Sequence, residues 1–154
     1  MMKSNKIFIV NFVFLPLVIG CFIYFVWRND SLNMFHWFQF IGMGSTITYL
    51  RELFNPFLTD FSRWIIYSLP GGLWIFSYIC LMGFIWEKVN NRIFIFWFTI
   101  GLVISVGSEI FQSLQFLEGT FSVLDLVTYF ISIIISLVLI NTRERIKNEI
   151  ITKC

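Results

Sequence analysis

Long apolar runs separated by short polar segments dominate the chain. Four of them, residues 7–27, 64–86, 93–111 and 121–140, each hold roughly 20 residues, enough to cross about 30 Å of hydrocarbon as a helix. Trp27, Trp64 and Trp86 fall at run ends, where amphipathic rings favour the headgroup layer. The pattern predicts an all-α, polytopic membrane protein with four transmembrane helices in a single membrane domain, residues 1–154.

A fifth apolar and aromatic stretch, residues 34–50, is interrupted by polar side chains such as His36 and Gln39. Basic residues are retained on the cytoplasmic side of short loops. With four spans, eight of them share one side, and the other side has Arg28, Arg51 and Arg63. A fifth span would give seven against four at best. We therefore expect both termini in the cytoplasm and 34–50 as an interfacial helix or re-entrant segment.

Composition supports a membrane protein and narrows the possible chemistry. The chain is 58% hydrophobic and 13% charged, whereas soluble domains carry about 25% charged residues. The net charge of +2 is not gathered into a patch, so we expect no nucleic-acid partner. Three scattered cysteines and one histidine show no metal-ligand spacing. We expect no metal and no cofactor.

Polar residues gather at one end of the predicted helices. Arg63 and Tyr67 open the second span, Glu109 and Gln112 close the third, and Asp125 opens the fourth. The third and fourth spans are joined by about ten residues, so they form an antiparallel helical hairpin. These five residues are the candidate binding site, a polar cluster at the outer mouth of the bundle.

Helical spacing gives each of these two spans a stripe of polar and small residues. One stripe is Gly101, Ser105, Glu109 and Gln112, and the other is Asp125, Thr128, Ser132 and Ser136. Small residues four apart let helices approach closely in lipid. We expect the stripes to face each other, with both carboxylates directed into the bundle.

Local structure offers another explanation for one carboxylate. Ser122 and Asp125 have capping-box spacing, so Asp125 is either a helix cap or a site residue. Glu109 lies at a helix C-terminus, where the macrodipole disfavours an anion, which favours a site or an inter-helix bond. Pro70, Gly71 and Gly72 predict a bend or a late start of the second span.

The motif EIFQ at 109–112, followed by FLEGTFSVLD at 116–125 and an apolar helix, resembles the C-terminal half of the VanZ-like membrane proteins. TDFSRWIIYSLPGGLW at 59–74 is similar to that family's region at the second span. The resemblance covers about residues 60–140. The chain departs from the family at Arg63 and Trp64, where a His is common. The resemblance implies a bacterial inner-membrane protein, and the family's named member is associated with resistance to the glycopeptide teicoplanin.

Three classes of function are compatible with these residues. The leading hypothesis is a non-enzymatic binding or accessory protein of the envelope, linked to glycopeptide resistance or envelope maintenance. Its partners would be membrane lipids, a lipid-linked envelope component or another membrane protein. The alternatives are a small oligomeric ion or proton-coupled transporter, and an enzyme acting on a lipid-linked substrate. The sequence contains no nucleophile and base pair or phosphate loop, and it leaves the oligomeric state open.

Overall fold

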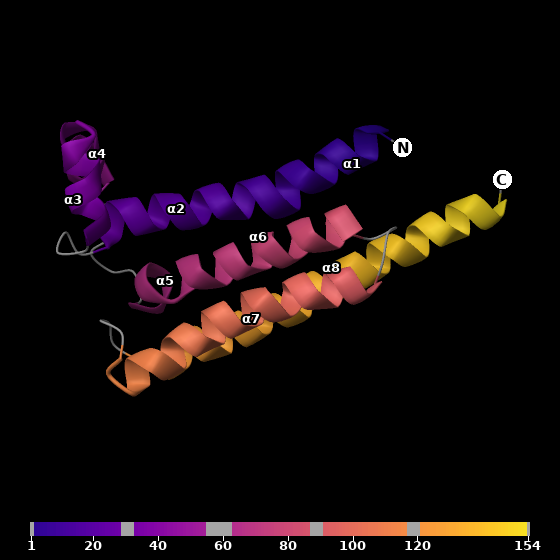
Figure 1. The fold of residues 1–154 in the computed structure, drawn as a ribbon. Coiled ribbons are helices and arrows are strands. Elements are labelled where there is room, and N and C mark those ends of the chain that lie inside the picture. The colour runs from indigo at the N-terminus through magenta and orange to yellow at the C-terminus, as the bar shows by residue number, and fades with distance from the viewer. Residues whose placement is uncertain (1, 29–32, 55–62, 87–90, 117–120, 154) are drawn as a thin grey trace.

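The computed structural model describes residues 2–28, 33–54, 63–86, 91–116 and 121–153 (Figure 1). Within these ranges the chain forms helices and turns, and no strand. The helices are α1 (Met2–Ile9), η1 (Val10–Phe14), α2 (Leu15–Trp27), α3 (Asn33–Phe40), α4 (Gly44–Phe54), α5 (Arg63–Tyr67), α6 (Leu69–Trp86), α7 (Asn91–Ser113) and α8 (Val123–Lys153).

Four helical segments are long and apolar enough to cross a membrane: Asn5–Trp27, Leu69–Trp86, Arg92–Ser113 and Val123–Ile146. They agree with the four predicted runs, so the chain is an all-α, multi-pass membrane protein. The start of α1 and the end of α8 lie at the same end of the bundle (Figure 1). α8 continues about two turns beyond its apolar part, carrying the basic C-terminal segment as helix.

The first span contains a single wide turn. α1, η1 and α2 follow one another without a break, and η1 is a π-helical turn in which the Leu15 N–H donates to the Val10 carbonyl. Pro16 comes directly after it and has no N–H to give to the usual carbonyl four residues earlier. A π turn accommodates such an interruption within a helix.

α6 lies at the centre of the bundle (Figure 1). It packs against α2, α7 and α8, and its contact with α8 is the most extensive between any two helices described. α7 and α8 contact each other far less. The polar stripes of α7 and α8 do turn inward, since Glu109, Thr128 and Ser136 are buried. The prediction that the stripes face each other was wrong, because Gly101 of one stripe and Ser132 of the other contact α6 instead.

Glycines bring α6 close to its neighbours. A methyl group built on Gly72 would lie 2.5 Å from Thr128 Cγ2 and 2.9 Å from Ser132 Oγ of α8. Gly83 meets Ile140 in the same way, and Gly101 of α7 accommodates the Tyr78 ring of α6. Because lipid tails are as apolar as the helices, such close packing is a main source of association in the bilayer. The small residues of both stripes thus serve contacts with α6.

The second span is interrupted at Ser68, where α5 ends and α6 begins. Pro70 follows two residues later and cannot donate a backbone hydrogen bond, which confirms the predicted bend. The Ser68 N–H donates to the Trp64 carbonyl at 2.9 Å, and the Gly72 N–H donates to the Ser68 carbonyl at 3.2 Å. The break therefore leaves the chain hydrogen-bonded on both sides while α5 changes direction.

The 34–50 stretch forms two short helices that lie across the end of α2 (Figure 1). α3 has 8 residues and α4 has 11, so neither can cross about 30 Å of hydrocarbon. Gly42, at φ +83°, ends α3 in a Schellman motif in which Met43 N–H donates to the Phe38 carbonyl. The alternative of a fifth span through this stretch is thereby excluded.

Arg51 of α4 fastens this helical pair to α2. Its Nε donates to the Phe25 carbonyl at 2.9 Å and its Nη2 to the Arg28 carbonyl at 2.7 Å. The guanidinium also stacks on Phe35 of α3, 4.4 Å from the ring centroid. A helix C-terminus has carbonyls without intrahelical partners and a partial negative charge. Arg51 donates hydrogen bonds to two such carbonyls at the end of α2, and its positive charge is favourable beside the negative end of the helix dipole.

We expect Gly72→Ala to lower the free energy of unfolding by about 1 to 3 kcal/mol, the usual cost of overpacking. The Thr128 side chain cannot easily move away from the added methyl group, because its hydroxyl accepts a hydrogen bond from Trp64 Nε1 and donates one to the Leu124 carbonyl. Thermal unfolding in detergent measures the effect. Gly107→Ala is the matched control, since a methyl group there meets nothing within 4 Å. Equal stability of the two variants would contradict the packing role of Gly72.

We expect Arg51→Met to loosen α4 without unfolding the bundle, because methionine keeps the aliphatic stem but loses the donors to α2. Hydrogen exchange of α4 amides should become about tenfold faster or more, given about 1 to 3 kcal/mol for hydrogen bonds to a charged group. Exchange in α6 and α8 should stay unchanged. Thr48→Val is the control, because the Thr48 hydroxyl bonds only within α4, to the Gly44 carbonyl. Unchanged exchange of α4 in Arg51→Met would rule out this anchoring role.

Candidate binding site

A cavity of about 880 Å³ lies at the end of the bundle opposite the two termini. Side chains from α2, α5, α6, α7 and α8 line it. Four of the five predicted site residues are among them: Tyr67, Glu109, Gln112 and Asp125. The fifth, Arg63, begins α5, but its side chain lies outside the described residues. Residues from three predicted spans thus come together as the sequence suggested.

Glu109 is held between α7 and α8. Its side chain is only 4% exposed, and its Oε2 accepts a hydrogen bond from the Ser122 backbone N–H at 3.4 Å. Tyr129, nearly two turns into α8, also interacts electrostatically with this carboxyl group. A carboxylate near the start of a helix is favoured by the helix dipole. Glu109 lies at the unfavourable end of its own helix and at the favourable end of α8.

This arrangement replaces the predicted capping box. In a capping box the Asp125 carboxylate would accept from the Ser122 N–H, but that amide is engaged by Glu109 instead. The Asp125 N–H donates to the Ser122 carbonyl at 3.1 Å, which begins the helix by a backbone bond alone. Asp125 Oδ1 is buried without a hydrogen-bond partner. Asp125 therefore faces the cavity with an unused acceptor.

Arg28, just past the end of α2, is the one basic residue among the described side chains that line the cavity. Its guanidinium carbon lies 4.8 Å from the ring centroid of Tyr67 and 5.6 Å from that of Tyr24. Both distances are within the range of cation–π attraction. Arg28 also interacts electrostatically with Glu109, as does Asp125 with the opposite sign. Two aromatic rings thus orient the guanidinium near the two carboxyl groups.

α5 lines one side of the cavity, and a side-chain hydrogen bond connects it to α8. Trp64 Nε1 donates to Thr128 Oγ1 at 2.7 Å, which ties α5 to the first turns of α8. The break at Ser68 makes this contact possible, because α5 can turn away from the axis of α6. Tyr67, the last residue of α5, is thereby placed over Arg28.

Sequence reasoning missed two residues that are central to the cavity. Arg28 was counted only as a topology signal, although it directly follows the Trp27 that marks the same end of the bundle. Tyr129 lies four residues after Asp125, so helical spacing places both on one face of α8. Neither residue has a motif of its own. Their spacing from the ends of the predicted spans was the available signal.

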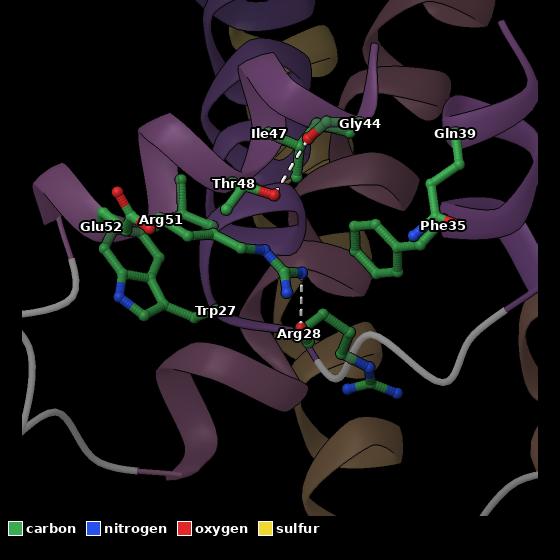
Figure 2. Close-up of a pocket in the computed structure, with 10 residues that line it drawn as sticks. Trp27, Arg28, Phe35, Gln39, Gly44, Ile47, Thr48, Arg51 and Glu52 are labelled. Carbon is green, nitrogen blue, oxygen red and sulfur yellow. Dashed lines mark hydrogen bonds between the residues drawn. The ribbon is translucent and has the colours of Figure 1, made fainter. Parts of the chain in front are cut away.

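A second, smaller cavity of about 480 Å³ lies between α2, α3 and α4. Figure 2 shows Arg51 reaching across it to the Arg28 carbonyl, while the Arg28 side chain turns away from Arg51. Burial lowers the pKa of Arg51 from its ordinary value. Arg51 uses its donors on backbone carbonyls of α2 and so holds α4 in place. We therefore assign this smaller cavity a structural role, as the space between α4 and the end of α2.

Comparison with known proteins gave no match: no family model, no curated protein and no solved structure is similar to this chain.

We expect Glu109→Leu to lower the free energy of unfolding by about 1 to 3 kcal/mol, because it leaves the partly buried Ser122 amide without its hydrogen-bond acceptor. Glu109→Gln is the matched variant, since its amide oxygen can still accept from Ser122. Thermal unfolding in detergent should rank wild type and Glu109→Gln close together and Glu109→Leu clearly lower. Equal stability of the Leu and Gln variants would show that this inter-helix bond contributes little.

Proposed function

We propose that the chain is a VanZ-like protein of the bacterial inner membrane whose cavity binds the polar part of an envelope component without transforming it. The observation that carries the proposal is the convergence of Arg28, Glu109 and Asp125, from three different spans, on one cavity of about 880 Å³. Ligand sites are typically concave, of about 300 to 1,000 Å³, with a few polar groups among aromatic walls. The family resemblance adds the bacterial envelope as the setting and glycopeptide resistance as a candidate phenotype.

The side of the membrane follows from the charge distribution. The cavity lies at the end carrying Arg28 and Arg51, whereas the opposite end carries the termini and most basic residues. Under the positive-inside rule the termini are cytoplasmic and the cavity faces the outer leaflet. A component of the outer face of the inner membrane is therefore the proposed class of ligand.

Close packing beneath the cavity supports binding over transport through one chain. One turn below its polar residues, Gly72 is pressed against Thr128 and Ser132, and further along Gly83 is pressed against Ile140. A conducting or alternating pathway needs polar groups or space across the bilayer. In the described part of the α6 and α8 interface, tight glycine contacts occupy that position.

We expect Glu109→Gln/Asp125→Asn to lose a species that the wild type retains during affinity purification from native membranes in mild detergent. The double variant keeps acceptor oxygens and side-chain volume but removes both negative charges from the cavity. Protein and lipid mass spectrometry at matched abundance identifies the species. Glu144→Gln, which changes a carboxylate at the opposite end of α8, is the control and should behave as wild type.

The proposal is contradicted if Glu109→Gln/Asp125→Asn is as stable as wild type and copurifies with the same proteins and lipids. In that case the two carboxylates are structural and the cavity is not a recognition site. If the double variant alone is unstable, the single Glu109→Gln and Asp125→Asn variants are measured in the same way, and retention of every species by both contradicts the proposal.

A further inference from the structure

An apolar groove continues the cavity toward the middle of the bundle. It has a volume of about 450 Å³ and runs between α6 and α7, lined by Ile75, Tyr78, Trp97, Ile100 and Ile104. It shares Gly71, Trp74, Ser108 and Tyr129 with the cavity. From Gly71 to Tyr78 it follows about two turns of α6. The polar cavity and the hydrocarbon-like groove therefore adjoin at these four shared residues.

The polar end favours a ligand that carries a positive charge. Among the described residues that line the cavity, two carboxyl groups face one guanidinium. Asp125 Oδ1 is buried without a donor, and an unmet buried acceptor is costly. The walls also include the rings of Tyr24, Trp64 and Tyr129, and aromatic faces attract cations. A primary ammonium group supplies both the charge and the N–H donors that Asp125 lacks.

Arg28 suits a second group on the same ligand. Its guanidinium is oriented by Tyr24 and Tyr67, and a planar guanidinium is well matched to phosphate oxygens. A head group with an ammonium and a phosphodiester therefore complements both signs of charge in the cavity. An acyl chain attached to that phosphodiester would have the adjoining groove to lie in.

We infer that the cavity and the groove together bind one phospholipid with a primary-ammonium head group, of the phosphoethanolamine type. Glu109 and Asp125 face the ammonium, Arg28 contacts the phosphate, and one acyl chain lies between α6 and α7. The inference rests on the proposed function and names the ligand class for that same site. It is a matter of binding, and no bond is made or broken.

The test is native mass spectrometry of the purified full-length protein with three phospholipids of identical acyl chains. Phosphatidylethanolamine has the ammonium with its N–H donors, phosphatidylcholine has a quaternary ammonium without them, and phosphatidylglycerol has neither. We expect the wild type to retain phosphatidylethanolamine about tenfold over each of the other two. Glu109→Gln/Asp125→Asn should abolish that preference. Equal retention of either competitor by the wild type would overturn the inference.

The groove is tested separately with a matched pair of tryptophan substitutions on α7. Ile104 lines the groove and is 66% exposed, whereas the adjacent Val103 is 64% exposed and does not line it. Ile104→Trp should fill the groove and reduce phosphatidylethanolamine retention about tenfold, while Val103→Trp should leave it unchanged. Equal retention by the two variants would refute the placement of the acyl chain.

Failure of this inference can be told apart from failure of the proposed function. If no preference for phosphatidylethanolamine is found, yet purification from native membranes still yields another species that depends on Glu109 and Asp125, only the lipid assignment is wrong. If neither experiment finds a species that depends on these carboxylates, both proposals are wrong.

Discussion

Close approach of α6 to its neighbours is the constraint on which the rest of the structure depends. In a bilayer, apolar surface alone does not drive helices together, so contact must come from shape and from polar bonds. Gly72 and Gly83 of α6 admit side chains of α8, while Gly101 of α7 admits the Tyr78 ring of α6. Tyr78 also donates from its hydroxyl to the Trp97 carbonyl at 2.8 Å, which gives the α6 and α7 contact a polar component. The central helix thus sets the spacing of the other three spans.

The cavity follows from what happens where this close packing stops. The second span is broken at Ser68, just before Pro70, so α5 turns aside and the space beside Gly71 is lined by longer side chains. α7 is mostly exposed to lipid and packs little against α8, and Glu109 ties its end to the Ser122 amide. The same carboxyl group therefore positions a helix and lines the cavity. This dual role explains why a buried acid near a helix C-terminus is compatible with a stable fold.

Much of this architecture could be predicted from the sequence, because lipid imposes one length and one polarity on each span. The four spans, the bend near Pro70 and the convergence of Tyr67, Glu109, Gln112 and Asp125 all followed from run length and helical spacing. The partner of each small-residue stripe did not, because a glycine indicates a close approach without saying which helix approaches. An inter-helix bond of Glu109 was among the expectations, but its partner, the Ser122 amide, was not, since that amide was expected to be capped within its own helix. Gly42 was a readable signal for the turn between α3 and α4, because its position between two short apolar segments is typical of a helix C-terminus.

Arg51 connects the peripheral helices α3 and α4 to the cavity, although no described residue of either helix lines it. It binds the carbonyl of Arg28, and the side chain of that same residue stands between two tyrosines in the cavity. Moving α4 would pull on the backbone that carries this guanidinium. By thermodynamic linkage the coupling runs in both directions, so a ligand held by Arg28 would also hold the α3 and α4 pair against α2. A displacement of the α3 and α4 pair would therefore move Arg28, and with it would change the affinity of the cavity for any ligand that Arg28 contacts.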